Sequence, residues 1–84
     1  MADVTMYTTR FCPYCVAAKR LLKAKGVEYT EIGVDGDREL RQQMQEKAGQ
    51  HTVPQIWIGE RHVGGFTDLA GLAANGELDR LLTS

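Results

Sequence analysis

The sequence predicts an α/β fold in which a four-stranded mixed sheet carries helices on both faces. Three observations lead to this prediction. Strand-type and helix-type patterns alternate in the order β-α-β-α-β-β-α. A short strand-type run precedes Cys12, and an amphipathic helical stretch follows it. Near the end, a tight turn at Gly59-Glu60 joins two short strands. The β-α-β unit should be parallel with a right-handed crossover, and the later hairpin antiparallel.

The first strand and first helix flank the cysteine-containing loop. We expect a strand over residues 4–8 and a helix that begins at Pro13, because proline lacks an N–H that the first helical position does not need. Gly26 should end this helix. A stripe of apolar residues recurs at helical spacing and predicts the inward face: Val16, Ala17, Leu21, Leu22 and Ala24.

The remaining elements follow in close succession. A second strand is expected over 27–32 and a second helix over 37–48. A third strand, 55–58, should pair with a fourth, 61–63. Thr67 is expected to cap a last helix, because threonine side chains accept hydrogen bonds from the first helical N–H groups. Leucines and alanine should face inward in this helix and in a short one after it: Leu69, Leu72, Ala73, Leu78, Leu81 and Leu82.

Length and charge narrow the classes of protein and partner. With 84 residues, we expect a single domain over 1–84 that acts as a monomer. The net charge of −1 gives no reason to expect nucleic acid or an anionic membrane as partner. No apolar run reaches the length that spans a bilayer. The first residues lack the basic and apolar pattern of a secretory signal, so we expect a cytoplasmic protein.

The two cysteines of the chain stand in Cys12-Pro13-Tyr14-Cys15, at the start of the first predicted helix. The unpaired N–H groups and the dipole of a helix start favour a thiolate, which is the species that attacks disulfides. Cys12 should be exposed, and Cys15, one turn later, more buried. This predicts thiol–disulfide exchange with Cys12 as the nucleophile and Cys15 as the resolving thiol.

Positive charge gathers around this pair. Residues 1–27 carry five Lys or Arg and one Asp, although the whole chain is slightly acidic. Arg10, Lys19 and Arg20 are expected to favour the thiolate if their side chains turn towards the sulfur. The same charge would attract an anionic small substrate, and Tyr14 would shield the sulfur.

Two plainer interpretations of the cysteine pair have less support. A structural disulfide is rare in the cytosol, where thiols stay reduced. A zinc site would need two further ligands, and only His51 and His62 are available, at a spacing unlike that of zinc fingers. We therefore expect no bound metal.

Three motifs together resemble the glutaredoxin family. Cys12-Pro13-Tyr14-Cys15 resembles the active-site motif of dithiol glutaredoxins, and Thr52-Val53-Pro54 is similar to the family's segment with a cis proline. Gly64-Gly65-Phe66-Thr67-Asp68 is similar to the family's Gly-Gly-x-x-Asp segment. The resemblance covers essentially the whole chain and implies the thioredoxin fold, in agreement with the predicted order of elements.

The resemblance implies a glutathione site, and the residues suit one physically. Backbone groups of Val53 would pair with glutathione as a strand edge does. The start of the last helix would offer N–H groups to its carboxylate, and Asp68 would bind its ammonium. Thr9 stands where the family usually has Lys or Arg, so a contact from Arg10 is carried over only weakly. The expected glutathione-binding residues are Tyr14, Arg41, Thr52, Val53, Pro54, Gly65, Phe66, Thr67 and Asp68.

The implied activity is that of a glutathione-dependent thiol–disulfide oxidoreductase. Its substrates would be protein disulfides, reduced by both cysteines, and glutathionylated proteins, reduced by Cys12 alone. Glutathione would be a co-substrate, with no tightly bound cofactor. Three alternatives stay open: a redoxin reduced by thioredoxin reductase, an iron–sulfur carrier, which Pro13 disfavours by stiffening the loop, and an adaptor domain without turnover.

Overall fold

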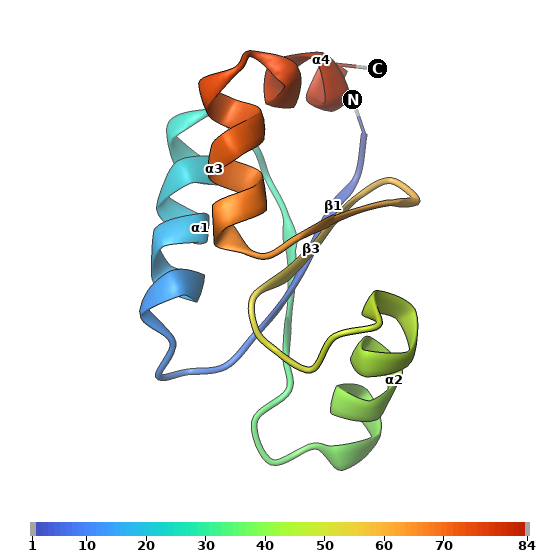
Figure 1. The fold of residues 1–84 in the computed structure, drawn as a ribbon. Coiled ribbons are helices and arrows are strands. Elements are labelled where there is room, and N and C mark those ends of the chain that lie inside the picture. Colours follow the sequence, from blue (N-terminus) through green and yellow to red (C-terminus); the bar gives the residue numbers. More distant parts are fainter. Residues whose placement is uncertain (1, 84) are drawn as a thin grey trace.

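Strands and helices alternate along the chain as the sequence predicts. Figure 1 shows the computed structural model, in which residues 2–83 are described. The elements are β1 (Val4–Thr8), α1 (Pro13–Ala24), β2 (Thr30–Gly33), α2 (Arg38–Ala48), β3 (Gln55–Ile58), β4 (Arg61–Gly64), α3 (Phe66–Ala74) and α4 (Glu77–Thr83). The expected α/β fold with the order β-α-β-α-β-β-α is confirmed, and α4 is the short final helix expected after it.

The four strands form one mixed sheet in the order β2-β1-β3-β4. β1 pairs with β2 in parallel, with Tyr7 opposite Ile32. β1 and β3 are antiparallel, and so are β3 and β4. The central position of β1 places its carboxyl end, and the loop to Cys12, beside the segment that leads into β3.

Helices cover both faces of the sheet (Figure 1). On one face, α1, α3 and α4 bury Ala18, Leu22, Leu69, Leu78 and Leu82 against the strands. On the other face, Met44 of α2 packs with Tyr7 and Val34. Ala2 N–H donates to the carbonyl of Leu82 at 3.3 Å, which joins the two ends of the described chain. Within residues 2–83, no helix is both long and apolar enough to cross a bilayer.

Three details of the elements differ from the sequence prediction. β2 begins at Thr30 rather than at residue 27, because Val27 N–H bonds back to the Leu22 carbonyl and completes the end of α1. Val16 is exposed, and the buried face of α1 consists of Cys15, Ala18 and Leu22. The residue that caps α3 is Gly65 rather than Thr67, which lies in the first turn of the helix.

Candidate active site

Cys12 occupies the N-cap position of α1, as its place before Pro13 predicts. Its backbone is extended, with φ −124° and ψ 106°, and its Sγ accepts the N–H of Cys15 at 3.2 Å. The same sulfur lies 3.6 Å from the carbonyl oxygen of Val53, to which its thiol donates. The first turn of α1 holds no acidic side chain. The helix start therefore presents N–H groups and a positive dipole end to a half-buried sulfur.

Cys15 lies in a different environment one turn into α1. It is 1% exposed, and both cysteines are free thiols. Burial, and next the hydrogen bond with Cys12, raise the pKa of Cys15 to about 12. A backbone hydrogen bond from Thr9 and the charge of Lys19 act in the opposite direction on this pKa. The predicted contrast between an accessible first thiol and a buried second one is confirmed by this geometry.

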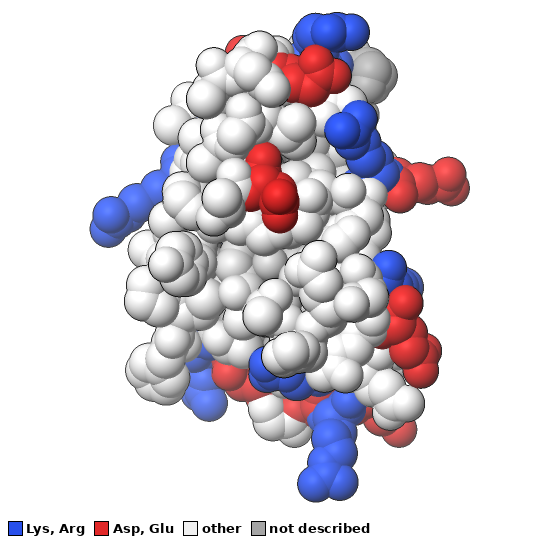
Figure 2. Space-filling view, in the orientation of Figure 1, with Lys and Arg blue, Asp and Glu red and all other residues white. Residues whose placement is uncertain are grey.

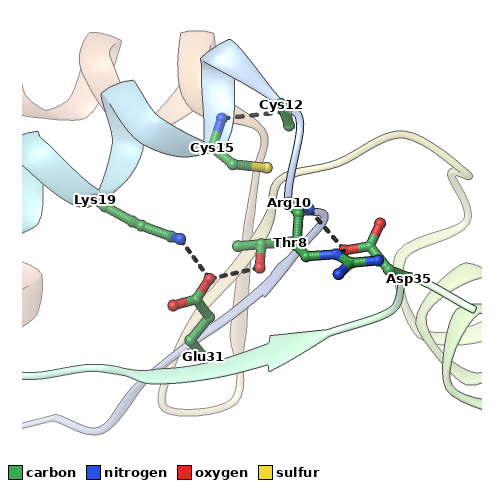
Figure 3. A network of polar contacts seen from close by, with 7 residues as sticks. All are labelled: Thr8, Arg10, Cys12, Cys15, Lys19, Glu31 and Asp35. Carbon is green, nitrogen blue, oxygen red and sulfur yellow. Dashed lines mark hydrogen bonds and ion pairs between the residues drawn. The ribbon is translucent and has the colours of Figure 1, made fainter. Parts of the chain in front are cut away.

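Two of the three basic residues named above, Arg10 and Lys19, are paired with carboxylates (Figure 3). Arg10 is exposed, its Nε lies 3.6 Å from Asp35 Oδ2, and its backbone N–H donates to the same oxygen at 2.7 Å. Lys19 Nζ lies 2.5 Å from Glu31 Oε2. Arg20 is exposed on α1.

A groove of about 210 Å³ gathers nearly all the residues predicted to bind glutathione. Its lining comes from the start of α1, the segment before β3 and the start of α3: Tyr14, Gln50, Thr52, Val53, Pro54, Gly65, Phe66, Thr67 and Asp68. Arg41 does not line it, and its guanidinium donates to the His51 carbonyl at 3.4 Å, beside Gln50. Arg10, bound to Asp35, is outside as well. A larger cavity of about 480 Å³ is lined by residues from 2–4, 26–30 and Leu82, none of which is a cysteine.

A buried glutamine holds the segment that forms one wall of the groove. The Val53–Pro54 peptide bond is cis, as the resemblance implies. Gln55, 0% exposed, donates through Nε2 to the Thr52 carbonyl at 3.0 Å and to Gln50 Oε1 at 3.1 Å. His62 Nε2 lies 2.7 Å from Gln55 Oε1.

Sequence reasoning missed the roles of Gln50, Gln55 and His62 in this wall. A polar residue in the apolar strand Gln55–Ile58 is the signal that could have revealed Gln55. Gln50 and His62 carry no comparable signal, because the fold alone brings them to Gln55. His62, weighed above as a metal ligand, is half-buried, and its ring stacks on Trp57 with centroids 4.7 Å apart.

The start of α3 forms the opposite wall of the groove. The first intrahelical bond runs from Leu69 N–H to the Gly65 carbonyl, so the N–H groups of Phe66 and Thr67 precede the helical ladder. Asp68 Oδ2 accepts the N–H of Gly65 at 3.1 Å. Gly64 has φ +114°, and a Cβ there would overlap the Asp68 carboxylate. The structure thus gives Gly64 a steric reason to be glycine.

Apolar side chains stand exposed around the cysteine. Phe11, next to Cys12, is 92% exposed, and Tyr14 is also largely exposed. The ring of Tyr14 lies 6.4 Å from that of Phe66 at the edge of the groove. Figure 2 shows that the centre of the face it presents is largely uncharged, with most charged side chains at its margins.

Comparisons with known proteins agree with this fold. The sequence profile of the glutaredoxin family matches residues 4–63. A glutaredoxin of Pseudomonas aeruginosa is 56% identical over 84 residues, which cover 100% of both chains.

Solved structures give the same result. The solution structure of glutaredoxin from Brucella melitensis has a TM-score of 0.87 and 52% identity, over 98% of this chain and 89% of that one. The crystal structure of a buckwheat glutaredoxin–glutathione complex has a TM-score of 0.89 and 27% identity, over 98% of this chain and 77% of that one. With its thioredoxin-like fold and its paired cysteines at the first helix, this chain belongs to the glutaredoxin family, the thiol–disulfide oxidoreductases that use a dithiol active site.

Proposed function

We propose that Cys12 is the nucleophile and Cys15 the resolving thiol of a glutathione-dependent reaction on protein disulfides and glutathione mixed disulfides. One observation carries the proposal: Cys12 Sγ accepts a helix-start N–H at 3.2 Å and lies 3.6 Å from the Val53 carbonyl, in the wall of the groove. The sulfur is therefore next to the surface on which a peptide-like substrate would lie.

The reaction with a protein disulfide proceeds in two exchanges. The Cys12 thiolate attacks one sulfur of the target, forms a mixed disulfide and releases the other sulfur as a thiolate. Cys15 then loses its proton and attacks Cys12 Sγ, which forms the Cys12–Cys15 disulfide and releases the second target sulfur. The target gains two electrons and the enzyme loses two. Two glutathione molecules return these electrons, and glutathione disulfide leaves.

The groove fits the parts of glutathione. The backbone of Val53 offers an edge to the cysteinyl residue, and the free N–H groups at the start of α3 suit the γ-glutamyl carboxylate. Asp68 supplies a negative charge for the ammonium group, while it also accepts the Gly65 N–H. Arg41, bound to the neighbouring His51 carbonyl, is near enough to the groove wall to receive the glycyl carboxylate after a side-chain rotation. The glutathione complex of the buckwheat relative supports this proposal.

The exposed rim supports proteins as substrates. Phe11 and Tyr14 offer apolar contact area on either side of Cys12 in the sequence. We place this activity in the cytoplasm, where thiols are kept reduced.

Substitution of each cysteine by serine distinguishes the dithiol reaction from the monothiol reaction. Cys12→Ser should abolish both the reduction of a protein disulfide and the removal of glutathione from a mixed disulfide. Cys15→Ser should abolish the first and retain the second, because Cys12 alone carries the monothiol route. Both activities are measured with glutathione, glutathione reductase and NADPH. Loss of glutathione removal in Cys15→Ser would overturn the assignment of roles.

A further inference from the structure

We propose that Lys19 is a positioning residue for the resolving step: held in place by Glu31, its ammonium group stabilises the negative charge of Cys15 Sγ as this sulfur attacks the mixed disulfide. The inference rests on the proposed roles of the two cysteines. Lys19 would be a third residue that takes part in the reaction, and it does not line the groove.

The geometry follows from the helix and from one carboxylate. Lys19 is four residues after Cys15, so both side chains leave the same face of α1. Figure 3 shows both of them directed to the side of the helix where Thr8 and Glu31 lie. Glu31 Oε2 holds Lys19 Nζ at 2.5 Å and also accepts the hydroxyl of Thr8 at 2.7 Å. This shared oxygen restricts the ammonium group to the neighbourhood of the buried thiol.

The surroundings make a nearby charge effective. Cys15 and the neighbouring Thr8 are buried, and the side chain of Lys19 is only 29% exposed. Water therefore screens the interaction between the Lys19 ammonium group and the Cys15 sulfur poorly. The charged groups near this thiol are Lys19, Glu31 behind it, and Cys12 in its thiolate form.

The directions of the pKa shifts agree with this geometry. The charge of Lys19 lowers the pKa of Cys15, against the effect of burial, whereas the hydrogen bond and charge of Cys12 raise this pKa. The hydrogen bond to Glu31 raises the pKa of Lys19, so that the amine stays protonated.

Lys19 acts in the second step of the reaction, when Cys15 attacks the mixed disulfide. Once Cys12 is joined to the target, it no longer carries a negative charge, and its two opposing effects on Cys15 end. The opposing effect of burial remains, and so do the favourable effects of the Thr9 backbone hydrogen bond and of the charge of Lys19. Cys15 then passes its proton to water, its thiolate forms the bond to Cys12 Sγ, and the bond from Cys12 to the target breaks. The target sulfur leaves with the electron pair.

Reaction with 5,5′-dithiobis(2-nitrobenzoate) resolves the two steps in one trace. Attack by Cys12 on this aromatic disulfide releases one thionitrobenzoate, and attack by Cys15 on the resulting mixed disulfide releases the second. Stopped-flow absorbance of the reduced protein follows both releases. The first release also reports whether Cys12 of a variant reacts at the wild-type rate. No glutathione is present, so a failure of the proposed glutathione site would leave this test intact.

Three variants decide the proposal. Lys19→Met should slow the second release about threefold relative to the first, the effect on thiolate attack of a change of one unit in thiol pKa. Lys19→Arg should restore the ratio, because it keeps the charge and can still bind Glu31. Arg20→Met, which removes the same charge from an exposed position of α1, should keep the wild-type ratio. An unchanged ratio in Lys19→Met, equal slowing of both releases, or an equal effect of Arg20→Met would overturn the proposal.

Discussion

The Sγ atom of Cys12 lies 3.6 Å from the carbonyl oxygen of Val53, a residue 41 positions later in the chain. This contact joins the start of α1 to the segment before β3, and both belong to the wall of one groove. The central position of β1 in the sheet produces the contact, since β1 leads to the cysteine and pairs with β3. The reacting atom and the surface that would hold its substrate are thus fixed by the same sheet.

Alkylation should distinguish the two thiols of the reduced protein. At neutral pH, iodoacetamide is expected to modify Cys12 and to leave Cys15 intact, because Cys15 is buried and its pKa is raised to about 12. Peptide mass spectrometry after short exposure measures the modification at each site. Equal labelling of both cysteines would show that the second thiol is neither shielded nor held protonated. Unfolding in urea before alkylation is the control and should expose both.

The buried thiol should also make the reduced protein less stable in alkali. Burial, and next the hydrogen bond with Cys12, raise the pKa of Cys15 from 9.0 to about 12, so the contribution of this thiol to stability is complete below pH 9 and is lost as pH rises towards 12. The loss has a limit of about 1.4 kcal/mol per pH unit. Urea unfolding of the reduced wild type and of Cys15→Ala, at several pH values from about 8 to 10.5, measures it. The difference in stability between the two proteins should shrink or reverse with pH, and a constant difference would contradict the prediction.

Adjacent glycines at the start of α3 should respond differently to a methyl group. Gly64→Ala is expected to destabilise the protein by about 1–3 kcal/mol, because φ is +114° and the added Cβ would overlap the Asp68 carboxylate. Gly65 has φ −92°, and a Cβ there would lie 3.5 Å from the Pro54 carbonyl oxygen, an ordinary contact. Gly65→Ala should therefore unfold close to wild type. Thermal unfolding compares the pair, and equal losses would contradict the steric argument.

Removal of the buried amide of Gln55 should loosen the groove. Gln55→Leu leaves the Thr52 carbonyl and the His62 ring without this partner, and we expect a loss of about 1–3 kcal/mol in stability. The KM for glutathione should rise, because Thr52 and Val53 line the groove. Gln42→Leu is the control, since Gln42 is exposed on α2 and its amide contacts only Glu46. An unchanged KM in Gln55→Leu would show that the groove wall does not depend on this residue.

Local sequence signals predicted the elements well where the signals were strong. β1 and β3 have the expected bounds, because their apolar runs are short and end at turn residues. The helix that begins at Pro13 and the left-handed glycine at Gly49 after α2 follow from equally local rules. The N-cap of α3 was misassigned because Gly65, which has no side chain to indicate a cap, occupies this position, while Asp68 in the first turn accepts its N–H.

Contacts between distant elements could not be predicted in the same way. The sequence does not show how the side chains of Arg10 and Lys19 are held, since their carboxylate partners come from distant positions: Asp35 from the loop after β2, and Glu31 from β2. The sequence contains these charges but does not show which of them meet. The groove was largely predicted because the resemblance supplied its residues together, whereas Gln50 entered it only through the fold.

The most direct test of the central claim joins glutathione to Cys12 and observes where it lies. Cys15→Ser, treated with glutathione disulfide, should form a mixed disulfide at Cys12 that mass spectrometry detects. Amide chemical shifts in its NMR spectrum should change for Val53, Phe66 and Thr67 in the groove, relative to the reduced variant. The amides of Gly26 and Glu28, at the larger cavity, should keep their shifts. Failure of Cys12 to take up glutathione, or shift changes that miss the groove, would contradict the account.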